Sequence, residues 1–276
     1  MNYRHAYHAG NFADVHKHVA LVAILLHLRK KGKPFAIIDT HAGGGLYDLA
    51  GPEAVKTNEA GEGIAKLRGA PVRTPALRCY LEIVDAFSDR YPGSPLIAAQ
   101  LLRERDRLIA IEKHPEEFES LRRALAPFRN AHAVCGDGYR QLNALLPPPE
   151  RRGLVLLDPS YEETDEMETL ATAFAGAYRR FPTGIFPIWH PLKVKSRIEA
   201  FAGELRSAGP LKLLSLTIDV DHTDSSGDRL SAAGVLVVNP PHGLDLEMEA
   251  ASAEILPLLA RGAGASAMVD WISPPR

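Results

Sequence analysis

The chain has 276 residues, 46% of them hydrophobic, and a formal charge of −2 at pH 7. This length suffices for one large α/β domain or two small ones, each with a core. Because the charge is near zero, binding of RNA or DNA requires local basic patches. The longest early apolar run, residues 19–26, is too short to cross a membrane, and no apolar core of a signal peptide precedes it. We expect a cytoplasmic protein that binds no membrane.

Residues 1–18 are rich in histidine and aromatic residues and poor in aliphatic ones. The histidines lack carboxylate or thiolate partners at zinc-site spacings, so a metal site is the less favoured interpretation. The alternative is a polar segment that covers a ligand site. The two cysteines, Cys79 and Cys135, have no metal-type spacing and are expected to be small buried residues in a reducing compartment.

Helical periodicity predicts a helix over residues 14–30, ended by cations and Gly32. Residues 35–39 form a short strand that ends at Asp39 and leads into three consecutive glycines, 43–45. A dinucleotide-binding loop would place a third glycine where Asp48 stands. The pattern D-x-x-x-G-x-G instead resembles the first motif of S-adenosylmethionine-dependent methyltransferases, in which the loop passes beneath the methionine part of the cofactor.

Between residues 46 and 92 no buried strand is evident, and two polar helices are predicted over residues 53–68 and 75–90. We interpret residues 47–92 as a helical insertion between the first and second strands of an α/β sheet. Residues 1–46 and 93–276 then form one domain. After the insertion, Ser94 is the predicted N-cap of a helix that has Pro95 at its first position.

Further strands follow at intervals that are typical of a doubly wound sheet. They are expected at residues 108–112, 132–134, 154–157, 184–189, 211–219 and 234–238, with an edge strand at 263–272. Glu112 ends the second strand and could hold two ribose hydroxyls. Asp137 lies in a turn after the third strand and either satisfies local amides or accepts a hydrogen bond from an adenosyl amino group.

The most informative stretch runs from Gly153 to Tyr161. Five residues without polar side chains predict a strand buried on both faces, and Pro159 ends it. The sequence Asp158-Pro159-Ser160-Tyr161 resembles the D/N-P-P-Y motif of methyltransferases that modify exocyclic amino nitrogens. The similar sequence at residues 239–242 follows the last strand and lacks the aromatic residue, so we reject it as the site.

Together, these motifs resemble the RlmJ (YhiR) family of bacterial 23S ribosomal RNA adenine-N6 methyltransferases. The residues that carry the resemblance are Tyr3-Arg4-His5, His8-Ala9-Gly10-Asn11, Ala13-Asp14-Val15, Lys17-His18, Asp39-Thr40-His41-Ala42-Gly43, Tyr91-Pro92-Gly93-Ser94-Pro95 and Arg151-Arg152-Gly153-Leu154. The resemblance implies a Rossmann-like class I methyltransferase, with helices on both faces of the sheet and a small helical insertion between strands 1 and 2. It implies S-adenosyl-L-methionine as cofactor and 23S ribosomal RNA as substrate. The chemistry requires no metal, and we expect a monomer.

The resemblance also assigns roles to single residues. The implied cofactor-binding residues are Lys17, His18, His41, Ser94, Glu112, Asp137 and Gly138. Tyr3 would contact the RNA, and Asp158 would be catalytic. From the residues themselves we add Arg4 as an RNA contact and Pro159 and Tyr161 as catalytic residues. Ser160 departs from the usual second proline of the motif. Because any residue has a backbone carbonyl, Pro159 can still accept a hydrogen bond from the target amino group, although the stiffness of a second proline is lost.

We expect Asp158 and that carbonyl to orient N6 of a flipped adenine, on which an exposed Tyr161 would stack. Two alternatives remain at this stage. One keeps the chemistry but changes the acceptor to DNA adenine or another amino nitrogen. The other is a non-catalytic nucleic-acid-binding protein with a methyltransferase fold. The acids and the glycine loop argue against the second alternative, because a binding module has no need of them.

Overall fold

The computed structural model describes residues 5–192, 195–207, 209, 212–221 and 230–273. Both residues predicted to contact RNA, Tyr3 and Arg4, lie outside this described part. No helix in it is both long and apolar enough to span a bilayer.

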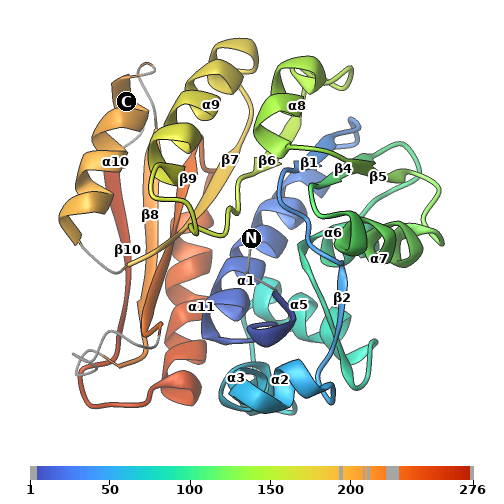
Figure 1. The fold of residues 1–276 in the computed structure, drawn as a ribbon. Helices are drawn as coiled ribbons and strands as arrows, with labels where there is room; N and C mark the ends of the chain where they lie inside the picture. The colour runs from blue at the N-terminus through green and yellow to red at the C-terminus, as the bar shows by residue number, and fades with distance from the viewer. Residues whose placement is uncertain (1–4, 193–194, 208, 210–211, 222–229, 274–276) are drawn as a thin grey trace.

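A single sheet runs through the molecule, with a parallel half and an antiparallel half (Figure 1). The parallel half has the order β5-β4-β1-β6, and its strands are Ala131–Cys135, Arg107–Glu112, Ala36–Asp39 and Gly153–Leu156. The other half has the order β7-β9-β8-β10, and its strands are Phe186–Pro191, Ala232–Val238, Leu213–Asp219 and Ser266–Ser273. Parallel bridges from Leu154 to Ile185 and from Leu157 to Ile188 join the halves. The predicted central parallel sheet is confirmed, and the C-terminal strand pairs at the edge as expected.

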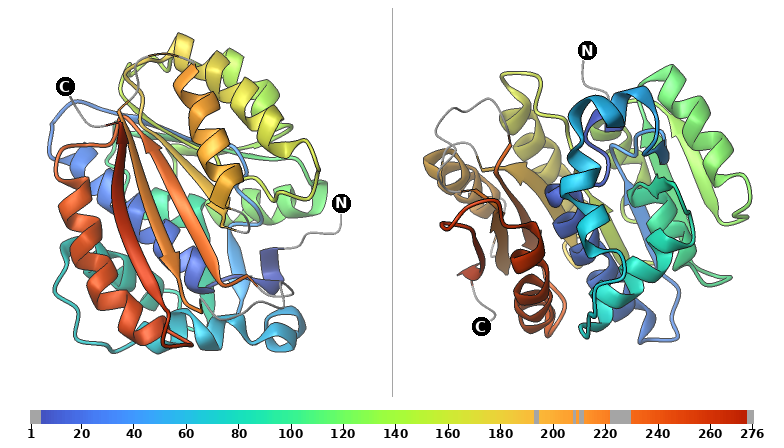
Figure 2. Two further views of the ribbon diagram at one scale, coloured as in Figure 1. Left: turned by 90° about the vertical axis from the view of Figure 1, so that its left-hand side faces the viewer. Right: turned by 90° about the horizontal axis from the view of Figure 1, so that it is seen from below.

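Helices cover both faces of the sheet (Figure 2). On one face lie α1 (Phe12–Arg29), α5 (Pro75–Asp85), α6 (Ser94–Gln100), α7 (Pro115–Leu125) and α11 (Leu244–Leu259). On the other lie α8 (Gly138–Leu145), α9 (Glu166–Arg180) and α10 (Lys195–Ser207). Alternate strand residues feed the two cores: Ile37 belongs to the first and Ile38 to the second. This alternation is the period-2 geometry of a strand buried on both faces.

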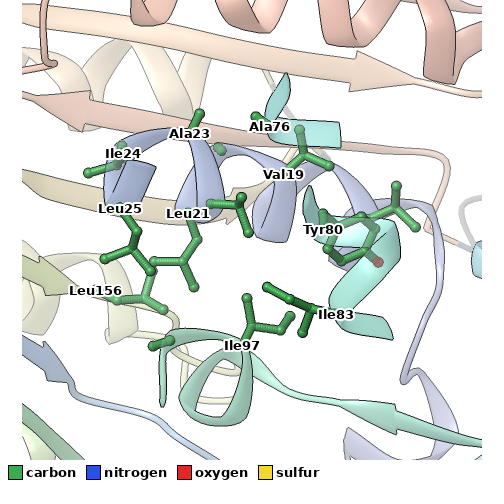
Figure 3. Packing of buried hydrophobic residues seen from close by; sticks show 14 of the residues in the cluster. Val19, Leu21, Ala23, Ile24, Leu25, Ala76, Tyr80, Ile83, Ile97 and Leu156 are labelled. Carbon is green, nitrogen blue, oxygen red and sulfur yellow. The ribbon is translucent and has the colours of Figure 1, made fainter. Parts of the chain in front are cut away.

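Helix α1 crosses the first core between the sheet and α5 and α6 (Figure 3). It begins two residues before the predicted start, because the Asn11 side chain caps it by accepting a hydrogen bond from the Asp14 amide at 2.9 Å. Its buried residues include the polar ones Asp14, His16, Lys17 and His18. A buried polar side chain needs a partner, and the partners of Asp14, Lys17 and His18 define the site described below.

The segment between β1 and α6 is more broken than the sequence predicts. Two short strands, β2 (Leu46–Asp48) and β3 (Arg90–Pro92), pair antiparallel at its ends. The helix predicted over 53–68 is three short ones, α2 (Pro52–Thr57), α3 (Glu59–Glu62) and α4 (Ile64–Leu67). It breaks at Asn58, which has φ 53°, and at Gly63. Tyr80 of α5 packs in the same core as α1, and the division of the chain into two domains stays a prediction.

Two smaller expectations are wrong. Ser94 is the first residue of α6 and caps nothing, since Gly93 is the N-cap without a side-chain hydrogen bond. Cys135 is exposed and Cys79 is half-buried, instead of both being buried. The reason for Cys135 is its place at the end of β5, which is an edge strand of the sheet.

Candidate active site

A cavity of about 1090 Å³ opens at the carboxyl ends of the parallel strands. Every predicted catalytic and cofactor-binding residue lines it: Lys17, His18, His41, Ser94, Glu112, Asp137, Gly138, Asp158, Pro159 and Tyr161. They meet there because the carboxyl ends of parallel strands share one edge of the sheet, where α/β folds bind ligands. Among the described residues, no group of three or more His, Cys, Asp or Glu side chains is arranged to hold a metal.

Lys17 lies at the centre of the cavity's polar network. Its Nζ atom donates a hydrogen bond to Asp158 Oδ2 at 2.6 Å and forms an ion pair with Asp14 Oδ1 at 2.9 Å. Burial acts to lower the pKa of Lys17, but the negative charges of Asp14 and Asp158 outweigh it and raise the pKa above its ordinary value. The same Nζ lies 5.8 Å from the ring centroid of Trp189. Lys17 is therefore a permanent cation that holds one oxygen of Asp158 in place.

Asp14 anchors the other side of this network. One of its oxygens accepts a hydrogen bond from the Gly10 amide at 2.9 Å, and His5 Nε2 lies 3.0 Å from the same atom. Burial acts to raise the pKa of Asp14, yet His5 and Lys17 together hold it well below its ordinary value. The N-terminal segment is thus tied to the first helix and, through Lys17, to the end of β6.

The glycine loop after β1 is held by Glu112. Its Oε2 atom accepts a hydrogen bond from the Gly43 amide at 2.9 Å, and Oε1 accepts one from the His114 amide at 2.6 Å. Gly43 has φ +60°, which favours glycine. Burial raises the pKa of Glu112. Each carboxylate oxygen has further lone pairs, so Glu112 can orient the loop and still accept hydrogen bonds from a ligand.

A close backbone approach shapes the side of the cavity near β5. A Cβ atom on Gly138 would collide with the carbonyl oxygen of Thr40, so only glycine fits there. Asp137 caps α8 by accepting a hydrogen bond from the Arg140 amide at 3.2 Å. The local-amide role considered for Asp137 is therefore present, and its other oxygen lies 3.6 Å from Lys113 Nζ.

His41 and Thr40 form a second polar pair at the cavity. The Thr40 hydroxyl donates to the Leu156 carbonyl at 2.8 Å, so it is the acceptor toward His41 Nδ1 at 2.7 Å. This arrangement puts the proton on Nδ1 and leaves Nε2 as an acceptor. Burial lowers the pKa of His41 to about 4, so the imidazole is neutral at pH 7.

Two predicted cofactor residues are engaged with the protein itself. The Ser94 hydroxyl donates to Asp39 Oδ2 at 2.6 Å, and burial raises the pKa of Asp39 to about 7. His18 Nδ1 lies 2.7 Å from the hydroxyl of Tyr91, which in turn lies 2.9 Å from the hydroxyl of Tyr80. Both residues line the cavity, so these contacts give them structural roles that do not depend on a ligand.

The loop after β6 presents Asp158, Pro159 and Tyr161 to the cavity. Tyr161 adopts φ +56°, donates its hydroxyl to the Trp189 carbonyl at 2.6 Å and lies 5.6 Å from the Trp189 ring. Its side chain is half-buried, not exposed as expected. Among the described residues, Asp158 Oδ2 is hydrogen-bonded to Lys17 and no partner holds Oδ1. One carboxylate oxygen is therefore held and the other is available to a ligand.

Comparison with known proteins shows the family to which the chain belongs. A family model described as "Ribosomal RNA large subunit methyltransferase D, RlmJ" matches residues 32–273. The proteins named ribosomal RNA large subunit methyltransferase J from Escherichia coli (strain K12) and Haemophilus influenzae are each 38% identical to this chain, over 99% of both sequences. The chain belongs to the RlmJ methyltransferase family. A crystal structure of a Legionella pneumophila protein agrees in fold, with a TM-score of 0.83 and 32% identity over 96% of this chain and 98% of that one.

Membership in the RlmJ family makes the chain a methyltransferase and implies a methyl donor of the S-adenosylmethionine type. The structure adds residues to the site that sequence reasoning missed. Asp14 pairs with Lys17, Trp189 packs beside Lys17 and Tyr161, and Tyr139 lies edge-on to His41. Only Asp14 carried a signal, since an acid three residues before a lysine shares a helix face with it.

Proposed function

We propose that the chain transfers a methyl group from S-adenosyl-L-methionine to N6 of a specific adenine in 23S ribosomal RNA. The observation that carries this proposal is the Asp158-Pro159 strand end beside the glycine-loop cavity, with Lys17 holding one oxygen of Asp158. Both curated relatives are named as methyltransferases of large-subunit ribosomal RNA. A ribosomal RNA substrate also accords with the predicted cytoplasmic location and requires no membrane.

The cavity has the donors and acceptors that this cofactor needs. Glu112 presents a carboxylate held by two backbone amides, suited to two ribose hydroxyls, and Asp137 presents one suited to the adenine amino group. Gly43 and Gly138 bring bare backbone to the cavity wall. The cofactor is cationic at its sulfonium and amino groups, so a cavity rich in carboxylates favours it electrostatically. We propose the remaining lining residues, Lys17, His18, His41 and Ser94, as parts of the same binding surface.

When bound, the cofactor would supply an electrophilic methyl carbon. N6 of adenine is a poor nucleophile, because its lone pair is delocalised into the ring. In the proposed mechanism Asp158 Oδ1 and the Pro159 carbonyl each accept a hydrogen bond from N6, which turns the lone pair toward the methyl carbon. Transfer would break the bond between sulfur and the methyl carbon as N6 bonds to that carbon, and N6 would then release one proton to water. Most of the catalysis is positioning.

The remaining parts of the proposal concern the base and the N-terminal segment. Tyr161 lines the cavity and would stack on the flipped adenine, and the hydrogen bond from its hydroxyl to the Trp189 carbonyl would hold the ring in place. Tyr3 and Arg4 offer an aromatic and a cationic side chain, which suits contacts with bases and phosphates. We propose a monomer that requires no metal.

The direct test is methyl transfer from labelled S-adenosylmethionine to 23S ribosomal RNA transcripts, with duplex and single-stranded DNA as parallel substrates. N6-methyladenine should appear at one position of the RNA and be absent from ribosomal RNA of cells that lack the gene. Transfer to DNA alone would replace the RNA assignment. Tyr3→Ala should lower transfer to RNA while cofactor affinity and melting temperature stay unchanged. Inactivation by EDTA would contradict the metal-free chemistry.

A further inference from the structure

The edge of the sheet opposite the cavity, where the parallel strands begin, has a dense group of cations. Three loops that precede β1, β4 and β6 supply them. We define the basic edge as Lys30, Lys31, Lys33, Arg103, Arg151 and Arg152. Lys30, Lys31, Lys33 and Arg151 are exposed, and the two other arginines are half-buried.

Hydrogen bonds between the loops show that they form one surface. Arg103 donates to the carbonyls of Lys31 and Lys33 at 2.8 and 2.9 Å, and Arg152 donates to the Lys33 carbonyl at 3.1 Å. Both guanidinium groups also lie against the Phe35 ring, 5.3 and 5.8 Å from its centroid. The arginines thereby fix the loop after α1, and that loop displays the three lysines.

The positive charge of the basic edge also acts on a nearby histidine. Partial burial lowers the pKa of His27, and the charges of Lys30, Arg152 and Lys31 lower it further. Among the nearby acids, Glu104 is exposed and, within the described part of the chain, forms no ion pair with these lysines, while two others are held by arginines. Asp106 is buried and accepts hydrogen bonds from Arg103, and Glu150 is paired with Arg107.

Within the described part of the chain, no carboxylate lies within ion-pair distance of Lys30, Lys31, Lys33 or Arg151. Cations are common at a helix C-terminus, where they complement the helix dipole. That effect explains Arg152, whose guanidinium binds the Leu28 carbonyl at 2.6 Å. It does not explain Lys33, four residues beyond the end of α1. Concentrated like charge destabilises a fold. An anionic partner bound at this surface would offset that repulsion.

The opposite edge of the sheet has the contrasting charge. Acidic side chains that include Glu163, Asp165 and Glu168 lie at the cavity and are exposed. Phosphates are repelled there, so the cavity is suited to a neutral base and contributes little attraction to an RNA backbone. The whole chain is slightly acidic, at −2. A basic surface apart from the cavity would supply further attraction for an RNA backbone.

We infer that the basic edge binds the phosphate backbone of the substrate RNA at nucleotides distant from the target adenine. This inference rests on the proposed function. Parallel strands of four to six residues rise about 3.3 Å per residue, which puts the two edges roughly 13–20 Å apart. A long folded ribosomal RNA can contact both edges, whereas a short oligonucleotide that enters the cavity cannot.

The test compares three triple variants with the wild-type chain. Lys30→Gln/Lys31→Gln/Lys33→Gln removes the exposed charges, and the same three lysines changed to Arg keep them. Lys56→Gln/Lys66→Gln/Arg90→Gln is the matched control, since it removes three exposed cations from the segment between β1 and α6. Filter binding to a long 23S ribosomal RNA transcript is measured across a salt series, with methyl transfer to a short target oligoribonucleotide and melting temperature beside it.

We expect the Gln variant of the basic edge to bind the long transcript roughly tenfold more weakly near 150 mM salt, with a salt slope smaller by about 2. Its melting temperature and its transfer to the short oligonucleotide should equal those of the wild type. The Arg variant and the control variant should bind the long transcript normally.

Unchanged affinity and slope in the Gln variant would overturn the inference. So would an equal loss in the control variant, or a loss in the Arg variant as well. The proposed function fails separately: wild-type protein that binds the transcript through the basic edge but transfers no methyl group would refute only that function. A wild-type protein without affinity for RNA would refute both.

Discussion

The two edges of the sheet carry nearly the same four-letter motif and use it differently. At the carboxyl end of β6, Asp158-Pro159-Ser160-Tyr161 lines the cavity, and Lys17 holds the acid. At the end of β9, Asn239 has φ 53°, and its amide donates to the carbonyls of Pro182 and Gly184, each at 2.8 Å. Strand β9 runs antiparallel to β7, so its end lies at the opposite edge. Strand direction therefore brings only the first of the two motifs to the cavity.

The largest expected effect separates these two motifs. Asp158→Ala should transfer methyl groups at least about a thousandfold more slowly, because N6 loses the group that orients it. Asn239→Ala should keep its activity and lose about 1–3 kcal/mol of stability, since two carbonyls lose their donor. Rates with 23S ribosomal RNA and urea unfolding measure the two effects. An active Asp158→Ala beside a folded but inactive Asn239→Ala would reverse the assignment of the two motifs.

The next effect tests the buried charges at the edge of the sheet that carries the cavity, where the parallel strands end. Lys17→Met removes the cation between Asp14 and Asp158 and should cost about 3–5 kcal/mol of stability, because two carboxylates lose their partner. Adding Asp14→Asn should recover part of this loss, and a urea double-mutant cycle measures the coupling. At the basic edge, Lys31→Met should change the free energy of unfolding by less than about 0.5 kcal/mol. An equal loss of stability in Lys17→Met and Lys31→Met would contradict the expected difference between the two edges.

A third effect depends on pH and concerns the buried His16. His16 is 1% exposed, its Nε2 atom has no hydrogen-bond partner among the described residues, and burial lowers its pKa to about 4. The unfolded chain binds this proton near pH 6.5 and the folded chain only near 4. The stability contribution of His16 is therefore complete above pH 6.5 and is lost as the pH falls toward 4, by up to about 1.4 kcal/mol per pH unit.

Melting temperatures between pH 7.5 and 4.5 test this expectation. His16→Met should flatten the decline on the acid side. The matched control is His242→Asn, at the exposed end of the motif that follows β9. It should leave the dependence of melting temperature on pH unchanged. Parallel profiles of wild type and His16→Met would show that His16 does not contribute to acid sensitivity.

The smallest expected effect concerns the two ends of β4. Glu112→Ala should weaken S-adenosylmethionine binding by about 1–3 kcal/mol, the usual range for lost hydrogen bonds to a charged group. Glu104, exposed in the loop before β4, is the matched control, and Glu104→Ala should bind the cofactor normally. Calorimetry measures both affinities. Unchanged affinity in Glu112→Ala would place the ribose elsewhere in the cavity.

Most of the sheet could be predicted from the sequence alone. Residues 153–157 contain no polar side chain, which specifies a doubly buried strand whatever surrounds it, and Pro159 cannot continue a ladder. Glu112, Asp137 and Asp158 each follow a strand of the parallel half, so their convergence at one edge follows from the strand order. These features depend on hydrophobic periodicity and backbone geometry, which are local properties of the chain.

Tertiary structure decided how the polar side chains are paired. Lys17 and Asp158 are 141 residues apart and meet at 2.6 Å, and Ser94 donates to Asp39 instead of capping its own helix. The helix expected over residues 53–68 is broken at Asn58 and Gly63, where the segment folds back against the first core. No local pattern encodes these contacts, because a buried charge is tolerated only when a partner from another element reaches it. The sequence by itself therefore determined which residues reach the cavity, and packing determined which of them hold one another there.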